Sequence, residues 1–74
     1  MWELDFQELK NRLSTNVKEL RRQKGLAQER LGLEAGVDRT LVSKIERKVA
    51  NPSLEILTKL ACQLDVTVAE LLTK

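Results

Sequence analysis

The 74-residue sequence has no histidine, a single cysteine and only two aromatic residues. Without histidine, and with Cys62 alone, the chain offers neither a disulfide framework nor the usual zinc-ligand spacings, so we expect no metal and no cofactor. Cys62 is expected to be a small buried apolar residue. There is also no phosphate-binding glycine loop, and the one cysteine has no histidine base, so we expect a protein that is not an enzyme.

Long apolar runs are absent too. None approaches the roughly 20 residues that a membrane-spanning helix needs. The amino terminus has acidic residues early and no signal-peptide core, so a cytoplasmic protein without a membrane partner is expected. Seventy-four residues make at most one domain, predicted here as 1–74. A core of this size is marginal without a partner subunit.

Charge is unevenly distributed along the chain, although the net charge is only +2. Residues 21–48 hold eight basic and four acidic side chains, a net charge of +4, whereas residues 1–20 and residues 49–74 each carry −1. A concentrated basic segment is typical of a surface that faces phosphates, although a solvated basic face would show the same pattern.

Apolar residues recur at helical spacing and nowhere alternate with strand period, so the predicted fold class is all-α. Five helices are predicted, at about 4–24, 27–34, 38–47, 54–64 and 68–72. The first carries an apolar stripe of Trp2, Phe6, Leu9, Leu13, Val17 and Leu20. We favour one continuous helix there, although Asn16 with Glu19 could cap a fresh one. Gly25 is the expected end of this helix.

The segment from Gln28 to Arg47 holds two short apolar stripes with a glycine between them. Its apolar residues are Leu31, Ala35, Val37, Val42 and Ile45. Gly36 stands where a chain leaving a helix often needs a positive φ, and Asp38 is a candidate N-cap for the next helix. Gly32 would let the two helices approach closely. Two short helices joined by such a turn predict a helix-turn-helix.

The same segment carries a family resemblance. Its residues Gln28, Leu31, Gly32, Ala35, Gly36, Val37, Val42, Ile45, Glu46 and Arg47 resemble, in order and without insertion, the lambda-repressor/Cro-like (XRE) helix-turn-helix family. The resemblance implies a five-helix lambda-repressor-like DNA-binding domain, with a family-like core at 16–72, an amino-terminal helical extension at 1–15 and the helix-turn-helix at about 28–47. Residues 38–40, 43 and 45–47 are similar to the controller proteins of restriction–modification systems.

The resemblance implies a transcriptional regulator that binds double-stranded DNA sequence-specifically, with a recognition helix at about 38–47 in the major groove. The implied base-reading residues are Arg39, Thr40, Ser43 and Lys44, with Asp38 and Leu41 at the margin. Arg39 is the first candidate, because a guanidinium can bond guanine O6 and N7 together. Leu41 is expected to face away from the core. The implied DNA backbone contacts are Gln28, Arg47, Lys48 and Asn51.

Three further positions matter for the architecture of the motif. Arg21 and Glu46 resemble a family pair that joins the first helix to the end of the third, the alternative being two unrelated surface charges. Ala27 stands where the family usually has Ser or Thr, which removes a side-chain cap worth about 1 kcal/mol. Lys48 stands where the family often has Gly, so it must adopt a positive φ or leave the helix differently.

One such unit buries too little surface for tight operator binding, so a homodimer on a palindromic operator is expected. The resemblance implies an interface on the last helix and its approach, made by Val66, Val68, Leu71 and Leu72. The stripe of Trp2, Phe6 and Leu9 is a rival surface, unless it simply covers the core. The alternative function is an antitoxin or a partner-captured regulator, for which that amino-terminal helix would be the main surface.

Overall fold

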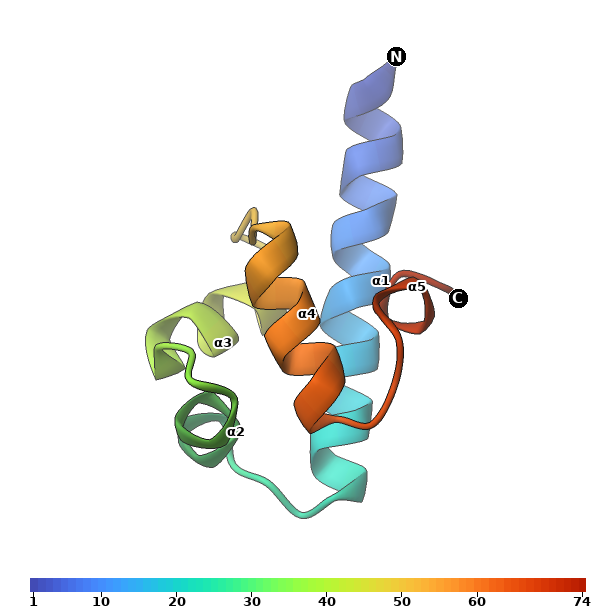
Figure 1. Cartoon of the computed structure of the whole chain (residues 1–74). Helices are drawn as coiled ribbons and strands as arrows, with labels where there is room; N and C mark the ends of the chain where they lie inside the picture. Colours follow the sequence, from blue (N-terminus) through green and yellow to red (C-terminus); the bar gives the residue numbers. More distant parts are fainter.

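The computed structural model describes residues 1–74 as five α-helices without a strand, which confirms the predicted fold class. The helices are α1 (Trp2–Gln23), α2 (Gln28–Ala35), α3 (Arg39–Glu46), α4 (Leu54–Gln63) and α5 (Val68–Leu71). Helices α2 and α3 lie on one side of α1 and α5 on the other, with the first turns of α1 extending beyond the rest (Figure 1). None of the five is both long and hydrophobic enough to cross a membrane.

A single cluster of buried apolar side chains draws on all five helices. Its members are Leu13, Val17, Leu31, Val37, Val42, Ile45, Ala50, Leu60, Ala61, Leu64 and Leu71. Cys62 is not among them: it is exposed, so the expectation of a buried thiol was wrong. The reason is rotational, because Leu60, Ala61 and Leu64 occupy the inward face of α4 and the next residue after Ala61 turns about 100° toward solvent.

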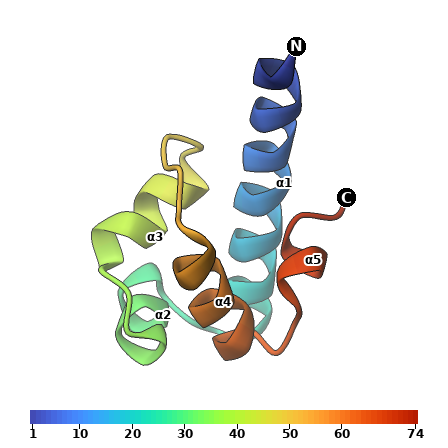
Figure 2. The ribbon, with the colours of Figure 1, turned by 45° about the horizontal axis from the view of Figure 1, so that its top comes forward.

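Helix α1 runs without a break through Ser14, Thr15 and Asn16, as favoured, and no new helix is capped at Asn16. Two of these polar residues, Ser14 and Asn16, make tertiary hydrogen bonds. Ser14 Oγ donates to the Glu46 carbonyl at 2.6 Å. Asn16 Nδ2 donates to three carbonyls at the end of α5, those of Glu70, Leu71 and Thr73, at 3.2, 2.8 and 2.7 Å. The carboxyl terminus is thereby held beside the middle of α1 (Figure 2).

Left-handed residues end four of the helices. Gly25 (φ 70°) and Gly36 (φ 71°) do so as predicted, and Lys48 takes the positive-φ option (φ 66°). The left-handed conformation costs about 1 kcal/mol for a residue with a Cβ such as Lys48. Two hydrogen bonds that close α3 offset this strain: Lys48 N donates to Ile45 O, and Val49 N donates to Lys44 O. Asp65 (φ 60°) ends α4 in the same way.

The starts of the helices follow their cap residues. Asp38, Ser53 and Thr67 each accept a hydrogen bond from a backbone N–H of the helix that follows, and Thr67 forms a full capping box with Glu70. Ala27 makes no side-chain cap for α2, because its methyl group cannot accept a hydrogen bond. The predicted starts of α3, α4 and α5 are therefore confirmed to within one residue.

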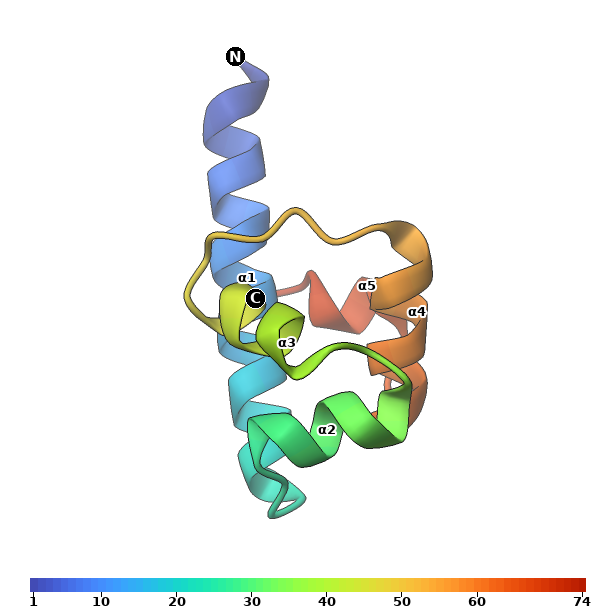
Figure 3. The ribbon, with the colours of Figure 1, turned by 90° about the vertical axis from the view of Figure 1, so that its left-hand side faces the viewer.

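Close contact between α2 and α3 depends on Gly32. A Cβ at this position would lie 2.6 Å from the Val37 carbonyl oxygen and 3.2 Å from the backbone N and Cα of Arg39. Any side chain would therefore push the start of α3 away. Figure 3 shows α2 and α3 crossing at this turn. The predicted helix-turn-helix is present, and Gly32 fixes its internal spacing.

Candidate nucleic-acid interface

The polar face of α3 points away from the core. Arg39, Thr40 and Lys44 are exposed and Ser43 is half-exposed, whereas Val42 and Ile45 on the opposite face are buried. The four base-reading candidates therefore share one accessible side of a helix that is firmly packed on its other side. Side chains of this length and polarity are those that reach base edges in the major groove.

The two marginal candidates are placed differently. Asp38 accepts a hydrogen bond from Thr40 N at 2.8 Å, and this backbone bond lowers the pKa of the carboxyl group below its ordinary value. Its role is to cap α3. Leu41 does not face away from the core: it is half-buried and packs against the apolar cluster, so that expectation was wrong.

A polar hollow of about 350 Å³ lies where α2 meets α3, lined by Gln28, Glu29, Arg39, Thr40 and Ser43. Within it Arg39 Nη1 donates to Glu29 Oε2 at 2.6 Å. Glu29 was not among the site residues predicted from the sequence. The available signal was Gly32, because a residue one turn before this close contact must lie beside the start of α3.

The carboxylate of Glu46 is the best-buried charge beside this surface. Arg21 binds it with two bonds, Nε to Oε2 at 2.7 Å and Nη2 to Oε1 at 3.0 Å. Gln28 Nε2 donates to the same Oε1 at 3.0 Å. The side chains of Arg21 and Glu46 are only 11% and 2% exposed. The predicted pair is confirmed in geometry, and the alternative of two unrelated surface charges is excluded.

The environment keeps this pair ionised. Burial on its own would raise the pKa of Glu46, but hydrogen bonds from Arg21 and Gln28 and the positive charges of Arg21 and Lys18 lower it below the ordinary value of 4.5. The hydrogen bond to Glu46 raises the pKa of Arg21. The pair therefore links α1, α2 and the end of α3 at neutral pH.

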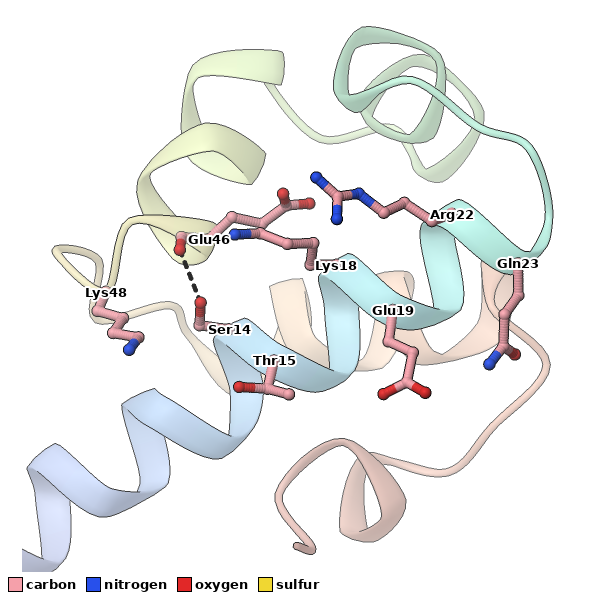
Figure 4. Close-up of a pocket in the computed structure, with 8 residues that line it drawn as sticks. All are labelled: Ser14, Thr15, Lys18, Glu19, Arg22, Gln23, Glu46 and Lys48. Carbon is pink, nitrogen blue, oxygen red and sulfur yellow. Dashed lines mark hydrogen bonds between the residues drawn. The ribbon is translucent and has the colours of Figure 1, made fainter.

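A second polar hollow, of about 610 Å³, lies between α1 and the end of α3. Figure 4 shows Ser14 bonded to the Glu46 carbonyl at its floor, with Lys18 extending toward Glu46 and Lys48 at one edge. The backbone-contact candidates Arg47, Lys48 and Asn51 are all exposed, after or at the end of α3. Gln28 is at the first position of α2, with its amide directed to Glu46.

The predicted interface residues are not all on the surface. Val66, Val68 and Leu72 are half-buried and pack against the core, but Leu71 is 0% exposed within its own chain. Leu71 has no side-chain surface to offer a partner, so its assignment to the interface is corrected to the core. On the rival surface Trp2 is 66% exposed and its ring lies 6.2 Å from that of Phe6.

A helix-turn-helix family model matches residues 17–71, which is most of the chain and includes every helix except the first turns of α1. The chain belongs to this XRE-type helix-turn-helix family. The match confirms the predicted family and leaves the first 16 residues outside its model.

A hypothetical transcription factor from Neisseria is similar in sequence and structure. In sequence the protein from Neisseria meningitidis is 41% identical over 92% of this chain, which spans 64% of that relative. A Neisseria crystal structure matches with a TM-score of 0.85 at 40% identity, over 90% of this chain and 75% of the other.

Two named controller proteins are similar as well. Control protein C.SmaI from Serratia marcescens is 38% identical over 93% of this chain and 82% of its own. The crystal structure of the restriction-modification controller protein C.AhdI from Aeromonas hydrophila has a TM-score of 0.77 at 42% identity, over 81% of this chain and 91% of that one. These relatives carry names of regulators and none the name of an enzyme.

The buried pair generates a stability prediction. Replacing Glu46 with Gln should lower the free energy of unfolding at pH 7 by about 3 kcal/mol, because Arg21 keeps its charge and loses its partner. Urea unfolding measures the loss. The matched control is Glu55→Gln, which removes an exposed pair with Lys59 and should cost less than about 1 kcal/mol.

The contribution of the Arg21–Glu46 pair to the free energy of unfolding should depend on pH. Since the folded-state pKa of Glu46 lies below 4.5, the unfolded chain takes up the proton first as the pH falls. The stability difference between wild type and Glu46→Gln should be full above pH 4.5 and shrink as the pH drops through the folded-state pKa. A difference that stays constant down to pH 3 would contradict this role.

Proposed function

We propose that this protein is a transcriptional regulator that binds a palindromic DNA operator sequence-specifically as a homodimer. The observation that carries the proposal is the exposed polar face of α3, held by the buried ion pair at the helix's other end. An α-helix fits the major groove of B-DNA, and α3 would enter it with its amino-terminal residues against base edges.

Within this proposal the residues divide into two groups. Arg39, Thr40, Ser43 and Lys44 read bases, with Arg39 placed at the first position of α3, where it can bond guanine O6 and N7 together. Gln28, Arg47, Lys48 and Asn51 contact the sugar-phosphate backbone, which fixes the register without carrying sequence information. The net +4 charge of residues 21–48 supports both groups.

The homodimer follows from a physical requirement. A single reading helix contacts one half-site, and two-fold symmetry doubles the contact and matches a palindrome. We place the interface at Val66, Val68 and Leu72, where apolar side chains remain half-exposed. Because one similar protein is named a restriction-modification controller protein and another a control protein, control of a restriction–modification system is the specific role we propose. In this role the protein would act in the cytoplasm, where its DNA target lies. It would act by binding and not by catalysis.

One observation favours a second candidate function. Trp2, Leu4 and Leu9, on the part of α1 that extends beyond the core, and Met1 just before the helix are exposed apolar residues. Exposed apolar side chains in this number on one short segment are typical of a binding surface for another protein. An antitoxin, or a regulator captured by a partner, would use this surface.

The operator titration separates base reading from positioning. Arg39→Ala should cost about 1–3 kcal/mol per half-site on a selected operator and relax the preference at one base pair. Lys48→Ala should weaken all duplexes about equally and make the salt slope shallower by about one for each phosphate that is no longer neutralised. Fluorescence anisotropy with the operator, a single-base variant and a scrambled duplex measures the affinities of both variants. If Arg39→Ala weakens all three alike, Arg39 is a phosphate anchor.

The interface is tested by sedimentation. Val68→Glu should convert the dimer to a folded monomer and abolish tight operator binding, because a carboxylate would be buried against its symmetry mate. Leu33→Glu is the control, since Leu33 is exposed on α2 and away from both candidate surfaces. A dimeric Val68→Glu together with a monomeric Leu9→Glu would move the interface to α1.

A further inference from the structure

Arg39, the first candidate for base reading, already has a partner in the free protein. Its Nη1 lies 2.6 Å from Glu29 Oε2, although the two side chains are 68% and 71% exposed. An ion pair this open to water contributes little to stability. The pair lies in the hollow lined by Gln28, Thr40 and Ser43, at the surface proposed to face the bases.

The backbone determines this pairing. Gly32 brings the Cα of Arg39 so close to α2 that a Cβ on the glycine would be 3.2 Å away. Glu29 lies one turn before Gly32 on α2, so its side chain emerges beside that of Arg39. The crossing of the two helices therefore places these two side chains within reach of each other.

Other acidic residues nearby have different partners. Asp38 is engaged as the N-cap of α3. Glu34, on the same helix as Glu29, pairs with Arg30 at 2.7 Å and accepts a bond from Gln63 on α4. Glu29 is the carboxylate that lines the reading hollow, and its one side-chain bond goes to Arg39.

A carboxylate at a DNA-facing surface repels phosphates and weakens binding to every duplex. It also restricts where the guanidinium can go. With one N–H of Nη1 on Glu29, the other four N–H groups of Arg39 remain available, enough for the two acceptors of guanine. A guanidinium held in this way is less free to swing to a phosphate, which any sequence would offer.

We propose that Glu29 is a positioning residue that sets the base specificity of Arg39, by holding its guanidinium over the groove floor and away from the DNA backbone. The inference rests on the proposed DNA-binding function and adds a specificity determinant to it. The carboxylate reduces affinity for all DNA, and a guanine correctly placed for Arg39 offsets that loss.

The test compares Glu29→Gln with Glu34→Gln in the full chain. Each removes one negative charge from α2 and breaks one ion pair with an arginine, so the net charge changes equally. Glu29→Gln should tighten binding to a scrambled duplex and lower the operator-to-scrambled affinity ratio roughly threefold to tenfold, because Arg39 gains a phosphate at the expense of guanine. Its salt slope should become steeper by about one per half-site. Glu34→Gln should leave the ratio unchanged.

A double-variant cycle excludes a purely structural effect. In an Arg39→Ala background, Glu29→Gln should no longer change the affinity ratio, since the group that it positions is gone. The inference is overturned if Glu29→Gln behaves like Glu34→Gln, if it tightens both duplexes equally, or if its effect persists without Arg39. A wild-type protein that prefers no selected duplex over a scrambled one would instead overturn the proposed function itself.

Discussion

The position of α3 depends above all on the buried carboxylate of Glu46. Two bonds from Arg21 of α1 and one from Gln28 of α2 converge on it, and Ser14 of α1 holds its carbonyl. Bonds from two elements to one buried charge resist rotation as well as separation. The helix that would enter DNA is thus fixed at its carboxyl end, and a rigid reading helix loses little conformational freedom on binding.

The other end of α3 is fixed by steric fit. Gly32 allows α2 to contact the backbone at Arg39, while Asp38 caps the first turn. Between these constraints the polar side chains project together on one accessible face. Basic charge near that face would supply affinity for DNA, and the Glu29 carboxylate bonded to Arg39 would limit how this arginine uses its charge. Such a face would combine strong binding with selective binding.

Much of this architecture follows from the sequence, because its causes are local. Apolar spacing predicts the five helices, Gly25 and Gly36 predict left-handed ends, and Asp38 predicts a cap. The Arg21–Glu46 pair came only from the family resemblance, since 25 residues separate its members. The wrong predictions concern which face of a helix a residue occupies. Leu71 was predicted at an interface and is buried, and Cys62 was predicted to be buried and is exposed. Glu29 was missed because its partner is on the next helix: apolar spacing alone does not reveal contacts between helices, and only Gly32 indicated this crossing.

The central claim is that α3 reads the major groove in two symmetry-related half-sites. Methylation interference on a selected operator tests it most directly, because dimethyl sulfate marks guanine N7 in the major groove and adenine N3 in the minor groove. We predict interference at guanine N7 in two clusters about one helical turn apart, or roughly 34 Å, with no effect of adenine N3 methylation there. Interference confined to adenine N3, or a single unpaired cluster, would contradict the account.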